Sequence, residues 1–412
     1  MHLSPYLKTA AVVLLSSGCS RGFHGGTSVS PRLPENASKV IEAQNGFAFR
    51  LLDQVLAGDA SAPRNMLISP VSIFMDLGMV YNGAASSTRE GIATTLGIGD
   101  IPTELVNATH EAQLTLLPTE DPAVTLAAAN AIWYRNSGAA PLAGFLKTAK
   151  TYYKARVSGA PFDASTLSEI NGWVSDQTRG KITSILDKIE PSDEMYLLNA
   201  VYFKGQWRDA FNAAATAPAA FHSPSGDLQV PFMAREARYN YLATDSLQLI
   251  ELPYGNGDFS MLVALPAQGV DLSAWVRAMD GARFGSLTAR MDSSKVKLRL
   301  PKWQYAYQVA DLKSDLSRMG MSEAFTPKAD FSGIYPPGEQ YAISKALHKA
   351  FIQVTEEGTE AAAVTSIGIS VTSMPLHPTP VMDVNRPFFY VIREKKTGSI
   401  LFMGVVTDPG KD

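Results

Sequence analysis

The chain has 412 residues, of which 46% are hydrophobic and 18% charged, a composition typical of a folded globular protein and not of a disordered one. The formal net charge is −3 and Lys and Arg form no continuous block, so the sequence offers no basis for nucleic-acid binding. A single cysteine, Cys19, excludes an intrachain disulfide.

The first 19 residues have the features of an export signal. Lys8 precedes an apolar run, residues 10–15, that is too short to span a bilayer. The sequence from Leu15 to Cys19 resembles a bacterial lipoprotein cleavage box, although Ser16 stands where Leu is preferred. We therefore expect a lipid on Cys19, with a plain secretory signal as the alternative. Residues 20–39, rich in Gly, Ser and Pro, are predicted to form a flexible tether.

Helical spacing of apolar residues begins near residue 40 and predicts an amphipathic helix that ends near Gly58. A short strand then leads into Ser69, which can cap a helix starting at Pro70, with Ser72 in its first turn. Residues 127–134 predict a buried strand. The strand at 197–207 is interrupted by Asn199, whose amide needs hydrogen-bond partners if it is buried.

Later elements are mostly hairpins. Residues 250–254 and 260–266 flank Gly255-Asn256-Gly257, which is predicted to be a turn because no helix follows, as a dinucleotide loop would require. A strand at 296–302 ends at Lys302. His348 is interpreted as a packed structural residue. Two apolar strands, 385–393 and 399–406, predict a C-terminal hairpin.

Residues 354–375 carry a less usual pattern. A turn at Glu356-Glu357-Gly358 precedes a run without proline, in which small and β-branched residues alternate. The face expected to be buried comprises Thr359, Ala361, Ala363, Thr365, Ile367 and Ile369, and Glu360 lies on the opposite face. The Ala-rich start is a poor strand former. The segment could thus join a sheet late, or be an ordinary edge strand or loop.

Signatures of enzymes are missing from the sequence. There is no Gly-x-Ser-x-Gly elbow, no His-Glu-x-x-His and no phosphate-binding Gly-x-x-x-x-Gly-Lys-Ser/Thr. The six histidines are far apart, and the only thiol lies in the export region. We therefore predict no enzyme activity, cofactor or metal site, with an enzyme that has a scattered, motif-free site as the alternative.

Two segments resemble the serpin family. Residues 356–365, EEGTEAAAVT, resemble the hinge of a serpin reactive-centre loop, and residues 382–392, MDVNRPFFYVI, fit the serpin signature. The similarity extends from about residue 40 to 409. It implies one α+β domain, residues 40–412, with three β-sheets, about nine helices and an exposed reactive-centre loop at about 356–380.

The resemblance also implies roles for individual residues. The hinge would comprise Glu356, Glu357, Gly358, Thr359, Glu360, Ala361, Ala362 and Ala363. The "shutter" and "breach", which control opening of the central sheet, would comprise Ser69, Ser72, Asn199, Trp207, Lys302 and His348. Within this set, Lys302 would pair with Glu356.

Serpins act as suicide substrates, so the resemblance implies a covalent complex with a target protease, formed by a monomer. The cut loop would insert into the central sheet, and residues 359–372 would span roughly 46 Å as a strand. Counting from the hinge puts the reactive bond at Thr372–Ser373, with Val371–Thr372 and Leu376–His377 as alternatives.

The target class follows from what the loop lacks. No Arg or Lys lies between Thr359 and Val384, which disfavours trypsin-like proteases. An elastase-like or subtilisin-like target is therefore expected, with a papain-like cysteine protease as the alternative. A non-inhibitory serpin that acts as a binding protein is the main rival function.

Overall fold

The computed structural model describes residues 32–58, 64–338, 341–359 and 378–411. All of them belong to one compact unit, Arg32–Asp412. Nine α-helices lie within the described residues: α1 (Ala37–Gly58), α2 (Pro70–Tyr81), α3 (Ser86–Leu96), α4 (Thr103–Leu116), α5 (Ala143–Tyr153), α6 (Ala164–Gln177), α7 (Leu272–Arg277), α8 (Gly281–Ala289) and α9 (Leu312–Leu316). None of these helices is long and apolar enough to cross a bilayer.

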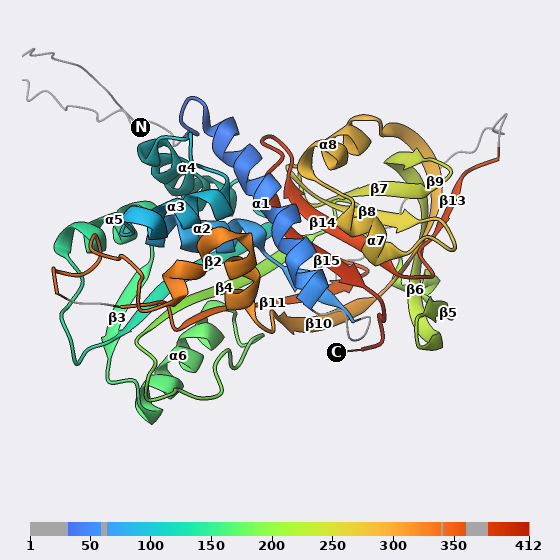
Figure 1. Ribbon diagram of the computed structural model, residues 1–412. Helices are drawn as coiled ribbons and strands as arrows, with labels where there is room; N and C mark the ends of the chain where they lie inside the picture. Colours follow the sequence, from blue (N-terminus) through green and yellow to red (C-terminus); the bar gives the residue numbers. More distant parts are fainter. Residues whose placement is uncertain (1–31, 59–63, 339–340, 360–377, 412) are drawn as a thin grey trace, which may run out of the picture. The chain divides into compact units, whose positions relative to one another are not determined.

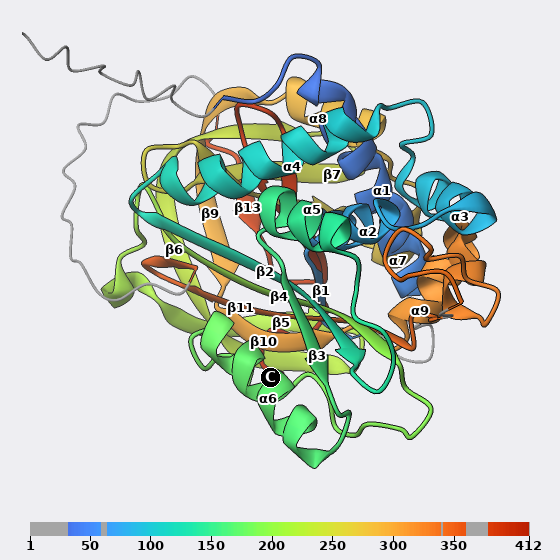
Figure 2. The ribbon, with the colours of Figure 1, turned by 90° about the vertical axis from the view of Figure 1, so that its left-hand side faces the viewer.

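The six-stranded sheet contains the segment of functional interest. Its strand order is β10 (Trp303–Gln308), β11 (Lys345–Thr355), β12 (Gly358–Thr359), β4 (Met195–Gln206), β2 (Val124–Arg135) and β3 (Arg156–Ala160). Helices α2, α4 and α5 lie on one side of this sheet and α6 on the other (Figure 2). Both faces of β4 are therefore buried, which explains its nearly unbroken apolar sequence.

The second sheet has nine strands. Its order is β1 (Met66–Ile68), β15 (Ile400–Val406), β14 (Phe388–Glu394), β8 (Phe259–Pro266), β7 (Leu247–Pro253), β6 (Gly226–Ala243), β9 (Asp292–Pro301) and β13 (Val381–Asp383), with β5 (Ala217–Ser223) on β6. The long strand β6 pairs with β5 near its start and with β7 near its end, so it joins two of the three expected sheets into one ladder.

The prediction of a single α+β domain is confirmed (Figure 1). The C-terminal hairpin appears as β14 and β15, and the turn around Gly255-Asn256-Gly257 joins β7 to β8. One local prediction is wrong: Ser69 precedes α2, but its side chain makes no cap bond. The Ser69 hydroxyl instead donates to the Leu401 carbonyl, because β15 lies close enough to compete for it.

Candidate functional site

The hinge residues Gly358 and Thr359 form β12, which lies between β11 and β4. Gly358 pairs with Thr355 on one side and Gln206 on the other, and Thr359 pairs with Val354 and Gly205. Both hinge residues are buried. The start of the expected exposed loop is thus already part of the sheet.

Gly358 fits this position because it has no side chain. Its φ is +146°, and a Cβ atom there would lie 2.1 Å from the carbonyl oxygen of Gly205. An L-residue would be strained by the backbone angle and would clash with β4. Gly358 therefore allows the chain to enter between two strands immediately after a turn.

Two stacked aromatic rings lie against the hinge and hydrogen-bond to it. The Trp207 and Tyr254 rings are 4.5 Å apart and inclined by 11°. Trp207 donates from Nε1 to the Thr355 carbonyl at 3.0 Å and from its backbone N–H to the Glu357 carbonyl at 2.8 Å. The Tyr254 hydroxyl is 2.7 Å from Thr359 Oγ1. These bonds fix the backbone on both sides of the turn.

Glu356 is held by Lys302, as the resemblance implied, and also by Thr216. Lys302 Nζ lies 2.8 Å from one carboxylate oxygen, and Thr216 Oγ1 donates to the other at 2.8 Å. Desolvation acts to raise the pKa of Glu356, but these bonds outweigh it and leave the pKa below the usual Glu value. The carboxylate therefore stays ionised at neutral pH, although its side chain is only 10% exposed.

Reversing either charge of this pair should destabilise the hinge. Glu356→Lys would place two cations together, and we expect the first unfolding transition to lose ~1–2 kcal/mol, since Lys302 is partly solvated. The double variant Glu356→Lys/Lys302→Glu should recover part of this loss. Urea unfolding followed by tryptophan fluorescence measures both.

A matched surface pair provides the control for this experiment. Glu236 and Lys295 also form an ion pair, but both side chains are more than a third exposed. Glu236→Lys should therefore change stability much less than Glu356→Lys. An equal effect of the two reversals, or a double swap as unstable as the single variant, would contradict a specific role for Glu356 and Lys302.

The strands β11 and β4 lie on either side of β12 at the hinge, and farther from the hinge they pair directly with each other. Their parallel pairing joins residues 345–350 to residues 196–201. At residues 351–353 of β11 and 202–204 of β4, the two strands are not paired with each other in the described part of the chain. The hinge thus enters at the end of the sheet where the two strands have separated.

A chain of buried polar groups crosses the sheet where the two strands pair. The Ser69 backbone N–H donates to His348 Nε2 at 3.0 Å, so Nδ1 carries the proton and donates to Asn199 Oδ1 at 2.9 Å. Asn199 Nδ2 then donates to Asn130 Oδ1 at 2.9 Å. The chain links the residue that precedes α2 to β11, β4 and β2, so it joins the strands that would have to separate for insertion.

Ser72 lies in α2 but does not join this chain. Its hydroxyl is buried and has no hydrogen-bond partner among the described residues. Of the two serines assigned to the shutter, Ser69 is the one that hydrogen-bonds His348 among the described residues, and it does so through its backbone N–H.

Burial keeps two histidines neutral. It lowers the pKa of His348 to about 3, and that of His110, packed between Phe74 and Tyr153, also to about 3. An unfolded His binds a proton near pH 6.5, so each group contributes stability above pH 6.5 that is lost as the pH falls towards 3. Burial also raises the pKa of Asp76. Its contribution to stability has the opposite pH dependence, because it is lost as the pH rises above 3.8.

We therefore expect acid to destabilise the protein, with a measurable share from His110. His110→Leu should reduce the loss of unfolding free energy between pH 6.5 and 4 by up to about 1.4 kcal/mol per pH unit. Urea midpoints across this pH range test it, and parallel slopes for wild type and His110→Leu would contradict it.

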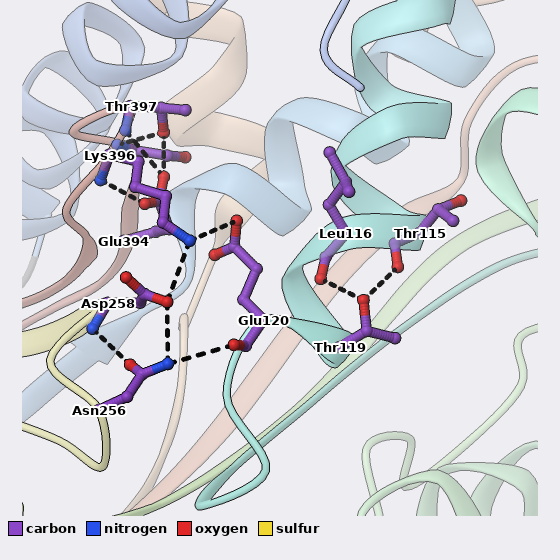
Figure 3. A network of polar contacts seen from close by, with 10 residues as sticks. Thr115, Leu116, Thr119, Glu120, Asn256, Asp258, Glu394, Lys396 and Thr397 are labelled. Carbon is purple, nitrogen blue, oxygen red and sulfur yellow. Dashed lines mark hydrogen bonds and ion pairs between the residues drawn. The ribbon is translucent and has the colours of Figure 1, made fainter. Parts of the chain in front are cut away.

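The entry end of the sheet is also tied to the C-terminal hairpin (Figure 3). Lys396 Nζ lies 3.0 Å from Asp258 Oδ2 and 3.9 Å from Glu120 Oε1. Asn256 Nδ2 contacts the same Asp258 oxygen and the Glu120 carbonyl. The neighbouring Gly255 N–H donates to the Gln206 carbonyl at 2.9 Å, so this turn supports β4 where β12 pairs with it.

Three contributors to the site were not found from the sequence: Thr216, Tyr254 and Asn130. Asn130 carried a usable signal, since it interrupts an apolar strand just as Asn199 does. Thr216 and Tyr254 had no such local signal, because their contacts with Glu356 and Thr359 arise only from the fold.

Several predicted residues lie outside the described residues, namely Cys19, Glu360, Ala361, Ala362, Ala363, Val371, Thr372, Ser373, Leu376 and His377. Among the residues that are described, no group of three or more His, Cys, Asp or Glu side chains could hold a metal ion.

Comparisons with known proteins agree with this architecture. The serpin family model (serine protease inhibitor) matches residues 42–409. The chain is 33% identical to an uncharacterised serpin-like protein of Thermococcus kodakarensis, over 90% of this chain and 86% of that protein. It is 32% identical to human serpin B8, over 90% of this chain and 99% of that protein.

Solved structures that are similar to this chain are also serpins or share the serpin fold. The native state of tengpin, a thermophilic serpin, superposes with a TM-score of 0.84 at 33% identity, covering 92% of this chain and 96% of tengpin. Human thyroxine-binding globulin in complex with thyroxine gives a TM-score of 0.83 at 29% identity, covering 91% of this chain and all of the globulin. With the hinge entering between two central strands and this family match over most of its length, the chain belongs to the serpin family.

Proposed function

We propose that the protein inhibits a serine endopeptidase as a suicide substrate and acts as a monomer. The observation that carries this proposal is the position of β12, already hydrogen-bonded to both β11 and β4. A loop that begins inside the sheet needs no separate step to find its insertion site. After cleavage, the rest of the loop would continue the same strand.

The register of β12 supports this path. Continued antiparallel to β4 from Thr359 and Gly205, it would bring Ala361 opposite Phe203 and Thr365 opposite Asn199. Continued along β11, it would bring the same residues opposite Ile352 and His348. The two registers agree because β11 and β4 are themselves in matching parallel register.

The residues that would face the core suit this register. Phe203 and Ile352 are buried, and Ala361 would fit between them without charge or bulk. Thr365 would reach the level of the His348–Asn199 bond, where a hydroxyl could replace a hydrogen bond that the separating strands give up. Ile369 would come opposite Met195, the first residue of β4.

We infer an elastase-like or subtilisin-like target with cleavage at Thr372–Ser373, since the loop offers only small or apolar residues there and no Arg or Lys. The test is cleavage by a pancreatic-type elastase followed by intact mass analysis. The expected C-terminal fragment begins at Ser373. A cut mapped after a basic residue would overturn the target class, and a first residue of Thr372 or His377 would move the bond.

We also propose that the protein is exported and anchored to the cell envelope through a lipid on Cys19. The support is the export signal followed by the only cysteine of the chain. Labelling with a fatty-acid analogue in a bacterial host should modify the wild type and not Cys19→Ser. Unlabelled wild-type protein in the culture medium would favour simple secretion.

A further inference from the structure

A small cavity lies beside the buried polar chain, between α2, the end of α4 and β2. Its volume is about 130 Å³. Most of its lining is apolar: Val71, Met75, Leu114, Leu117, Pro118, Leu126 and Ala127. An apolar cavity of about this size in another protein binds a benzene-sized molecule.

One polar atom that lines the cavity lacks a partner. Ser72 is fully buried, and its Oγ makes no hydrogen bond to any described residue. The Gln113 amide, by contrast, is bonded to Gln44. A buried hydroxyl without a partner is costly, so a water held in the cavity beside the guest would be stabilised by a hydrogen bond to it, which an alkyl tail cannot make.

Lys154 lines the cavity and is exposed to solvent, so it marks the outer end. Its ammonium donates to the Leu114 carbonyl at 2.8 Å and to Thr115 Oγ1 at 3.1 Å. Both partners are uncharged, and no ion pair of the described residues involves Lys154. An ammonium has three N–H groups, so one remains for a further acceptor.

The surface around this outer end is basic. Lys154 also lines a shallow groove with Lys150 and Arg156, and Lys147 is exposed on the same helix as Lys150. Arg156 is already paired with Glu169 and stacked over Trp133, which leaves the lysine charges without an acidic partner in the groove lining. An anion is therefore the complementary head group.

We propose that this cavity is a binding site for a short-chain monocarboxylate amphiphile, with a tail of about five carbons in the cavity and its carboxylate on Lys154. The apolar lining selects the tail, the cavity volume limits its length, and the unpaired ammonium selects the charge. A di-anion or a bulky ring system would not satisfy these three features together.

The test is calorimetric titration of the purified full-length protein with hexanoate. We expect saturable binding of one hexanoate, and acetate and hexan-1-ol should bind at least about tenfold more weakly because each lacks one recognition element. Lys154→Met should weaken hexanoate binding at least about tenfold and leave hexan-1-ol binding unchanged. The matched control is Lys147→Met, which removes an exposed charge of α5 outside the linings of the cavity and the groove and should keep the wild-type affinity.

A second variant tests the cavity itself. Ala127→Leu would fill it and should abolish hexanoate binding in protein that still shows the wild-type thermal transition. If Ala127→Leu does not fold, the comparison of hexanoate binding by Lys154→Met and Lys147→Met tests the proposal instead. The proposal would be overturned if hexanoate showed no saturable binding to the wild type. It would also be overturned if the two lysine substitutions weakened binding equally, because this would mean attraction to the basic surface only.

Discussion

Ala361→Glu is expected to convert the protein from an inhibitor into a substrate of its target protease. In the register of β12, residue 361 would lie between Phe203 and Ile352, both buried. A carboxylate there has no partner, and burying an unpaired charge costs several kcal/mol. Insertion would slow, deacylation would win, and the yield of covalent complex should fall at least about tenfold.

Position 360 provides the matched control for this variant. It would lie opposite Lys204 and Gln353, both only partly buried, so a charge is tolerated there and its removal should matter little. Glu360→Ala should keep complex formation, while the composition-matched Glu360→Ala/Ala361→Glu should lose it. The measurement is the ratio of complex to cleaved protein on a denaturing gel. Full activity of the Ala361→Glu variant would show that the strand does not continue in this register.

Asn199→Leu is expected to cause the largest loss of native stability. The change is nearly isosteric, but it removes the acceptor of His348 Nδ1–H and the donor to Asn130 Oδ1. Two buried polar groups would lose their partners at about 1–3 kcal/mol each, so the first unfolding transition should lose ~2–6 kcal/mol.

Ser72→Ala is the contrasting variant. Its hydroxyl is equally buried but has no partner, so removing it should leave stability unchanged or slightly higher. Urea midpoints and the rate of inactivation on heating measure both variants, and the rate is needed because a fold that inserts its loop only after cleavage is expected to be protected by slow unfolding. If Ser72→Ala is as damaging as Asn199→Leu, the hydrogen-bond chain through His348 is not what holds the strands together.

How far the sequence predicts this structure depends on the range of the interactions. The apolar runs of the C-terminal hairpin and the helical spacing of α1 are local, and these elements appear where their patterns indicate. The Lys302–Glu356 contact was expected from family resemblance, and its position follows from the pairing of β10 with β11 next to the hinge.

Contacts set by distant strands were not predictable from local patterns. Ser69 has the sequence of a helix cap, yet β15 takes its hydroxyl and His348 takes its N–H, because tertiary packing brings both within reach. Likewise, Tyr254 looks like the last residue before a turn, and only the fold reveals that its ring stacks on Trp207. The entry of Gly358 between two strands requires the register of both neighbours, which no single segment contains.

We propose that the loop of this serpin traps a protease by inserting into the sheet. The most direct test mixes the purified protein with pancreatic-type elastase, without an excess of the protease. The products are followed by denaturing gel and intact mass. We expect a covalent complex with the mass of one protease joined to the protein cut before Ser373, together with loss of protease activity near equal molar amounts. Complete cleavage of the loop with no covalent complex and with undiminished protease activity, across elastase, subtilisin-like and papain-like enzymes, would contradict it.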